Sequence, residues 1–314
     1  MGGQIGVITN QIIVFAILMT IGFIAVLTKV FTKESLNALS KLIVKIILPA
    51  LIFSIVAGSG VTLSDFLGRG RFAIAVVLIF ALLFSVGVLL SKFAGLKDKS
   101  ANVFIVLMMF GNMGFMGIPL IQELFKDPSS NVCISVYTII DMSLLWTLGV
   151  YYCSRHQKSS NSLGALKNMI NPTTVALTVA FVIMLLKISM PDLLMDTIAG
   201  IGGTSKYLTL IYIGGAMAFV SVKKVIKKPS ILLFPIVKML IIPVLVYLIS
   251  GFFLKQIDRS ILTIIAGLPS MTTIAMVASA YKSDDEYATE IIFVTTIASL
   301  LTIPAVSIIT SLMN

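Results

Sequence analysis

The sequence predicts an all-α polytopic membrane protein with ten transmembrane helices. They form two inverted five-helix repeats, with crossing broken helices in the fourth and ninth spans. Of the 314 residues, 58% are hydrophobic and 11% are charged, whereas soluble domains average roughly 25% charged residues. With a mean hydropathy of +1.08, a soluble fold would expose extended apolar patches of the kind that cause aggregation. The composition therefore excludes a soluble globular protein.

Ten apolar stretches are long enough to cross a bilayer, which takes about 20 residues of helix. The first five are residues 8–27, 42–60, 72–93, 101–124 and 132–152. The second five are residues 172–188, 194–220, 229–254, 260–280 and 287–311. Asp196, Lys206 and a glycine-rich stretch at 199–203 interrupt the seventh, so we expect it to begin with a short interfacial or re-entrant helix. The stretches are continuously apolar, which excludes the alternating strands of a membrane barrel.

The basic residues predict the orientation in the membrane. The chain has 23 Lys and Arg against 13 Asp and Glu, and most of the basic residues follow odd-numbered spans. Short loops rich in Lys and Arg remain in the cytoplasm, so we expect both termini outside and a multi-pass protein of the cell membrane. The basic cluster at 223–228 is interpreted as an anchor for anionic lipid headgroups. Because the basic residues lie between apolar runs, they do not indicate a nucleic-acid partner.

The chain also indicates an internal repeat. Half of 314 is 157, and a shift of 157 residues places Arg71 on Lys228 and Asp127 on Asp284. We expect a first repeat at 1–153, a short cytoplasmic linker at 154–171 and a second repeat at 172–314. A repeat with an odd number of spans must enter the membrane with the opposite orientation, as in secondary transporters. Ten evenly spaced helices could agree this well by chance, so the interiors of the fourth and ninth spans decide the question.

Both interiors contain residues that break helices. Gly costs a helix about 1 kcal/mol and Pro about 3 kcal/mol, and non-helical backbone at membrane depth is tolerated only in protein or around a wet cavity. Half-helices that begin at such breaks direct free N–H groups toward an anion. The predicted substrate-binding residues are Gly111, Asn112, Met113, Gly114, Pro269, Ser270, Met271, Thr272 and Thr273. The alternative is that Gly111, Gly114 and Gly117 only permit close helix packing.

Few charged residues lie deep in the spans. Asp141 and Lys238 lie at similar depth and are interpreted either as a buried ion pair or as a coupling site that changes protonation. The fourth span has no acidic residue before Glu123, and the ninth has none before Asp284, which favours an anion or neutral solute over a cation.

The sequence has no pattern that indicates an enzyme, a metal site or a cofactor. Cys133 and Cys153 lie at opposite ends of the fifth span, so they cannot form a disulfide. His156 lies in a polar loop and is interpreted as a solvated residue.

Seven short motifs, in order along the chain, resemble the auxin efflux carrier family, which includes bacterial malate and malonate permeases and plant auxin exporters. The motifs lie at residues 48–53, 111–120, 146–149, 171–172, 212–218, 268–269 and 301–304. The resemblance implies a ten-helix inverted-repeat fold similar to that of bile acid symporters. It also implies a scaffold at 8–60 and 172–220, a transport domain at 72–152 and 229–311, elevator-type movement, and a homodimer formed through the scaffold. Plant members have a proline where this chain has Gly111, and many have a long central loop that is absent here.

The predicted function is secondary active or facilitative transport of a small organic anion, a carboxylate such as a dicarboxylate or an auxin-like acid, with coupling to H⁺ or Na⁺ left open. Two alternatives stand beside it. One is a sodium-coupled symporter of the bile acid type, and the other is a membrane sensor that binds the ligand without transporting it.

Overall fold

The computed structural model describes residues 2–58, 63–125, 128–156, 172–219, 225 and 227–312, and these residues form helices and no strand. The all-α prediction is confirmed for this part of the chain. Five helices in it are long and apolar enough to cross a membrane: Lys33–Ala57, Gly70–Phe93, Ser130–Ser154, Pro229–Ser250 and Asp285–Val306. The ten-span topology therefore stays a prediction. Asp127, most of the linker at 154–171, and Lys223 and Lys224 of the basic cluster at 223–228 lie outside the described residues.

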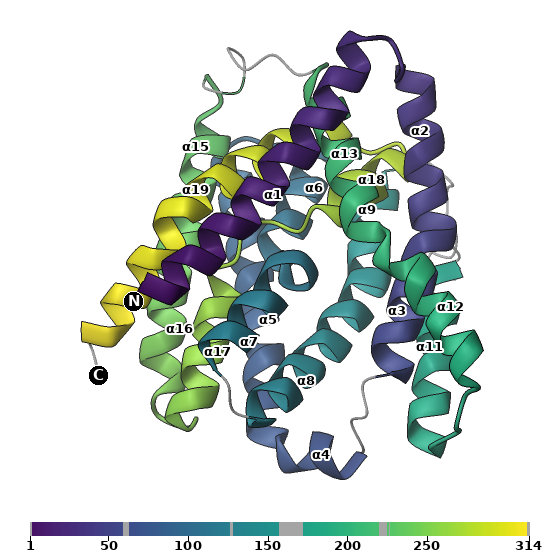
Figure 1. Ribbon diagram of the computed structural model, residues 1–314. Helices are drawn as coiled ribbons and strands as arrows, with labels where there is room; N and C mark the ends of the chain where they lie inside the picture. Colours follow the sequence, from purple (N-terminus) through teal and green to yellow (C-terminus); the bar gives the residue numbers. More distant parts are fainter. Residues whose placement is uncertain are drawn as a thin grey trace.

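The first half of the chain (Figure 1) contains α1 (Gly2–Leu27), α2 (Lys33–Leu42), η1 (Ile43–Ile47), α3 (Leu48–Ala57), α4 (Leu63–Gly68), α5 (Gly70–Phe93), α6 (Asp98–Met109), η2 (Met113–Gly117), α7 (Ile118–Leu124), α8 (Pro128–Leu144), η3 (Leu145–Gly149) and α9 (Val150–Ser154). The second half contains α11 (Pro172–Leu186), α12 (Asp192–Gly203), α13 (Ser205–Met217), α15 (Pro229–Ile236), η4 (Val237–Ile241), α16 (Ile242–Ser250), α17 (Gln256–Ala266), α18 (Thr273–Ala280) and α19 (Asp285–Leu312). The η segments are single wide turns of π-helix. The turns η1, η3 and η4 lie inside longer helices, whereas η2 begins the helix that continues as α7.

Three of the four π-helical turns have the same cause. The turns η1, η2 and η4 each end two residues before a proline, at Pro49, Pro119 and Pro243. A proline has no N–H to donate to the carbonyl four residues earlier and crowds that carbonyl. The helix continues by widening, and the residue just before each proline donates across five residues instead. Such turns occur frequently at functional sites.

The helices pack as two groups (Figure 1). In the first group, α1 packs along α13, and α3 packs against α11 and α12. Glycines allow the close approach of α1 and α13, since a Cβ added at Gly22 would overlap the Ile211 carbonyl and one added at Gly214 would overlap the Met19 carbonyl. The second group contains α5, α6, α8 and α15–α19. Helix α2 belongs to the first group, through η1 and α13, and α7 belongs to the second, through α8. Contacts of α18 with α2, and of α1 with α7 and α19, join the two groups.

The predicted seventh span is two helices in the structure. Thr204 separates α12 from α13, at the glycine-rich stretch that interrupts the apolar pattern. The first of these helices packs on α3, where Gly202 lies against the backbone of Ala50 and Leu51. Its position relative to a bilayer stays a prediction.

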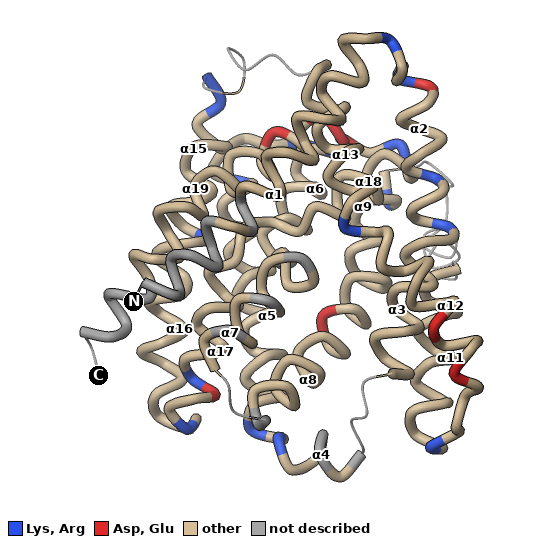
Figure 2. Tube along the Cα trace, viewed as in Figure 1, with Lys and Arg blue, Asp and Glu red and all other residues tan. Residues whose placement is uncertain are grey.

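The surface suits a lipid environment. Exposed side chains on α1, α5, α11 and α16 are large and apolar, including Ile17, Leu78, Val179 and Leu248. Most charged residues gather at the two ends of the molecule (Figure 2). Cys133 and Cys153 are both buried, and neither forms a disulfide, as expected.

Candidate functional site

Two stretches of extended backbone pair in the interior of the second helix group. We call them the crossing segments: residues 110–112, between α6 and η2, and residues 269–271, between α17 and α18. Gly111 and Ser270 form an isolated antiparallel bridge. The Asn112 N–H donates to the Pro269 carbonyl at 2.8 Å, and the Met271 N–H donates to the Phe110 carbonyl at 3.1 Å. Residues far apart in the sequence, from the fourth and ninth apolar stretches, therefore meet at one point.

The local sequence explains the pairing. Helix α6 ends at Met109, and Phe110 is extended (φ −102°, ψ 121°). A Cβ at Gly111 would lie 3.1 Å from Leu268 Cβ, so a larger residue would push the crossing segments apart. At the other crossing segment, Pro269 cannot continue the hydrogen bonding of α17 because it has no N–H.

The three glycines near the first crossing segment have different surroundings. A Cβ at Gly117 would collide with the side chains of Met113 and Leu268, whereas a Cβ at Gly114 would have no atom within 4 Å. The alternative that these glycines only permit close packing therefore applies to Gly111 and Gly117. It does not apply to Gly114, which lines a cavity.

This cavity of about 30 Å³ lies beside the crossing segments and has room for at least one water molecule. One wall belongs to the first helix group and the other to the second. The residues that line it are Leu48, Leu51, Ile52, Ile55, Asn112, Gly114, Met142, Leu145, Trp146, Met271 and Thr273. No acidic or basic side chain is among them.

Two unsatisfied donors distinguish the cavity. The Asn112 Nδ2 and Trp146 Nε1 atoms are buried without a hydrogen-bond partner, and the two residues are 1% and 0% exposed. Both groups are N–H donors, and a buried donor without an acceptor costs about 1–3 kcal/mol. Both donors therefore lack only a hydrogen-bond acceptor, such as a carboxylate oxygen.

The structure brings together most of the predicted site residues. Asn112, Gly114, Met271 and Thr273 line the cavity. Gly111, Pro269 and Ser270 form the backbone pairing instead. Met113 and Thr272 are buried beside it, each 1% exposed, and Thr272 Oγ1 has no partner.

Sequence reasoning did not place Trp146 in the site, nor the apolar wall from α3. Trp146 is the single tryptophan of the chain and belongs to one of the seven motifs. Its place in that motif was the feature of the sequence that could have indicated a role in the site.

No ion pair joins Asp141 and Lys238, which corrects one interpretation of these residues. The Lys238 Nζ donates to the carbonyls of Leu107, at 2.5 Å, and Phe110, at 2.8 Å. Both oxygens of Asp141 are buried without a hydrogen-bond partner. Similar depth in the sequence did not bring the two side chains into contact, because the carbonyls at the end of α6 take the ammonium group.

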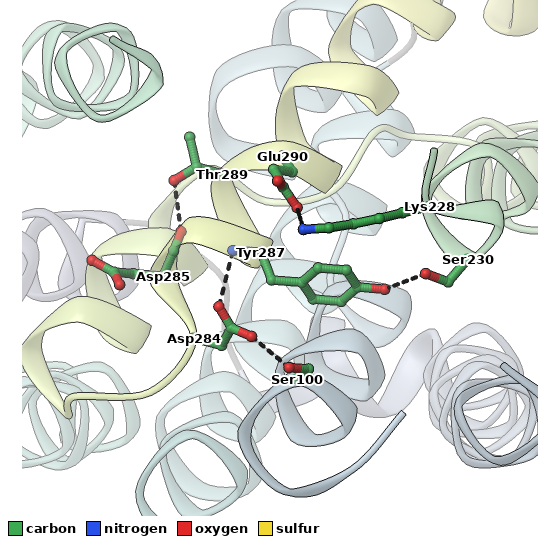
Figure 3. Close-up of polar contacts among 8 residues, drawn as sticks. All are labelled: Ser100, Lys228, Ser230, Asp284, Asp285, Tyr287, Thr289 and Glu290. Carbon is green, nitrogen blue, oxygen red and sulfur yellow. Dashed lines mark hydrogen bonds and ion pairs between the residues drawn. The ribbon is translucent and has the colours of Figure 1, made fainter. Parts of the chain in front are cut away.

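A second polar cluster surrounds the start of α19 (Figure 3). The Lys228 Nζ and a Glu290 carboxylate oxygen form an ion pair at 2.6 Å. The Tyr287 hydroxyl donates to Ser230 Oγ at 2.8 Å, and Ser100 Oγ donates to Asp284 at 2.5 Å. These contacts fasten α6, the start of α15 and the start of α19 to one another. The cluster is separate from the cavity and stabilises the second helix group.

Comparison with known proteins gives one family. The model of a family described as membrane transport protein matches the chain twice, at residues 7–163 and at residues 154–307. The two matches cover nearly the whole chain and divide it where the sequence predicts the linker between repeats. No curated protein matches the chain significantly.

Proposed function

We propose a function on one premise: the chain belongs to the membrane transport protein family, which is the auxin efflux carrier and malate permease-like family. It is a multi-pass membrane protein and a transporter. We infer further that its substrate is a small organic anion, a carboxylate, and that the anion binds at the cavity beside the crossing segments.

The pair of unsatisfied donors carries this inference. Asn112 Nδ2 and Trp146 Nε1 both lack an acceptor in a cavity whose lining contains no carboxylate. A hydrogen bond to a charged acceptor contributes about 1.5–3 kcal/mol, so one carboxylate could satisfy both groups. The start of η2 adds a positive helix end to the same place. The site holds an anion by dipoles and N–H groups and not by a positively charged side chain in its lining.

The rest of the lining indicates the other part of the substrate. Leu48, Leu51, Ile52 and Ile55 form an apolar wall, and such a wall excludes polar groups that it cannot satisfy. The carboxylate therefore carries an apolar portion that faces α3. A volume of about 30 Å³ is too small for such a molecule, so α3 must separate from the crossing segments before the substrate can enter.

The contacts between the two helix groups permit this separation. The polar contacts between them include those of Ser40 Oγ with the Met276 carbonyl at 3.0 Å and of Ser279 Oγ with Asn37 Oδ1 at 3.3 Å. Each such bond contributes about 0.5–1.5 kcal/mol net, a small cost for a domain movement. We assign the first helix group to a scaffold that forms a homodimer, and the second to a transport domain that moves against it as an elevator, with the Lys228 end facing the cytoplasm.

Uptake into proteoliposomes tests the assignment. Asn112→Ala removes one of the two donors, and we expect it to abolish saturable carboxylate uptake while the protein stays folded. Asn131→Ala is the matched control, because Asn131 is exposed on α8 and contacts Gln122. Unchanged uptake by Asn112→Ala would remove the crossing segments from the substrate site.

A further inference from the structure

The buried lysine on η4 is a feature that the proposed function does not explain. Lys238 is 1% exposed and lies in the π-helical turn between Pro235 and Pro243. A charged group so far from water is costly unless it is hydrogen-bonded. Its ammonium group also lies 5.8 Å from the centre of the Phe234 ring, within the range of a cation–π contact.

The partners of Lys238 are backbone oxygens at the end of a helix. Leu107 would normally accept a hydrogen bond from the N–H of Gly111, but Gly111 lies in the bridge with Ser270. The last carbonyls of α6 therefore need other donors, and together they carry a partial negative charge equivalent to about half an electron. Lys238 Nζ donates to Leu107 and Phe110, and Ser270 Oγ donates to Leu107 at 3.1 Å.

The same oxygens would suit a metal cation. Hard cations bind to carbonyl and hydroxyl oxygens, and in transporters with broken helices the carboxyl ends of half-helices coordinate Na⁺. In this chain the position is occupied by an ammonium group that is part of the protein. Asp141 lies at a similar depth in the sequence, but both of its oxygens are buried without a hydrogen-bond partner, so it does not form an ion pair with Lys238.

We propose that Lys238 is a built-in counter-cation of the crossing segments, held at the carbonyls of Leu107 and Phe110 where a coupling Na⁺ would otherwise bind. The protein then needs no Na⁺ at this position. The comparison with a coupling Na⁺ rests on the proposed function as a transporter. The occupation of a cation position rests only on the contacts of Lys238, so the two can be tested separately.

The test uses purified protein without substrate, in NaCl or in choline chloride at equal concentration. Wild-type protein should unfold at the same temperature in both. Lys238→Ala leaves a space lined by the carbonyl oxygens of Leu107 and Phe110, so Na⁺ should raise its unfolding temperature by about 3 °C or more, with saturation. Lys238→Met fills the space without a charge and should show no response to Na⁺. Lys41→Ala, at an exposed position, is the surface control.

Two results would overturn the proposal. One is a saturable stabilisation of the wild-type protein by Na⁺, and the other is the absence of any Na⁺ effect on Lys238→Ala. If Lys238→Ala does not fold in either salt, binding of radioactive Na⁺ to the wild-type protein decides: saturable binding contradicts the proposal, and its absence supports it. None of these measurements involves transport, so a failure of the proposed function would not produce the same results.

Discussion

Trp146→Phe tests the donor pair more selectively than a truncation, because it removes the Nε1–H and keeps an aromatic ring. Trp146 is 0% exposed, and its Nε1 has no partner in the substrate-free protein. The substitution should therefore act oppositely on the two states. It removes a favourable contact from the loaded site and an unsatisfied donor from the empty one.

The magnitudes follow from these contacts. Loss of a hydrogen bond to a carboxylate costs about 1.5–3 kcal/mol, which corresponds to roughly a 10- to 140-fold weaker affinity. In the empty protein, removal of the buried donor relieves about 1–3 kcal/mol, and the smaller ring loses about 1 kcal/mol through the space it leaves. The free energy of unfolding without substrate should therefore stay level or rise slightly.

The assay begins with a thermal-shift screen of mono- and dicarboxylates and indole acids, which selects the acid that stabilises the wild-type protein most. Concentration-dependent uptake of that acid into proteoliposomes then gives the KM of each variant, and thermal unfolding gives its stability. Tyr151→Phe is the matched control, since it removes a hydroxyl one turn away from Trp146 at a residue that does not line the cavity. An unchanged KM in Trp146→Phe, or an equal loss in both variants, would refute the role of the indole N–H.

Three further predictions concern other parts of the molecule. Gly114→Ala should reduce uptake and retain stability, because the added methyl group enters the cavity. Gly117→Ala should lose about 1–3 kcal/mol of stability, because the added methyl group collides with Met113 and Leu268. Equal unfolding temperatures of the two variants would contradict this difference. Lys228→Ala should destabilise the protein by about 1–3 kcal/mol, because it leaves the buried Glu290, 1% exposed, without its cation. The partial exposure of Lys228 reduces the size of this effect. Adding Glu290→Gln should restore most of the lost stability, and a purely additive result would argue against the ion pair. His156 is partly buried and not solvated as the sequence suggested. This burial, followed by the charge of Lys99, holds the pKa of His156 below its ordinary value. The unfolded chain therefore takes up the proton first, and stability falls as the pH falls below about 6.5. Unfolding scans across that range should show this slope in the wild-type protein and a smaller slope in His156→Gln.

The two segments of the candidate site could be inferred from the sequence because Gly and Pro act locally. Gly111 and Pro269 indicate where regular helix is unfavourable, and the structure pairs the two segments that contain them. The continuous apolar runs likewise predict helices from their composition alone. Both inferences need only the chemistry of neighbouring residues.

The parts that sequence reasoning did not find depend on the rotation of helices about their axes. Trp146 lies in η3 and lines the cavity, and nothing in the apolar pattern of the fifth span indicates which side of the helix faces the cavity. The same reason explains why the sequence suggested an ion pair between Asp141 and Lys238 that the structure does not contain. The position of a residue along a span indicates its depth in the membrane but not the side of the helix on which it lies. That the last carbonyls of α6 accept hydrogen bonds from outside the helix follows only from the pairing of the crossing segments.

The measurement that tests the central claim most directly is counterflow of a labelled carboxylate. Proteoliposomes are loaded with the unlabelled acid selected by the thermal-shift screen and then diluted into a trace of the labelled acid. A carrier with its site at the crossing segments should accumulate the label transiently above the external concentration, and Asn112→Ala should not. Binding of the acid without any counterflow in the wild-type protein would contradict transport and indicate a membrane sensor.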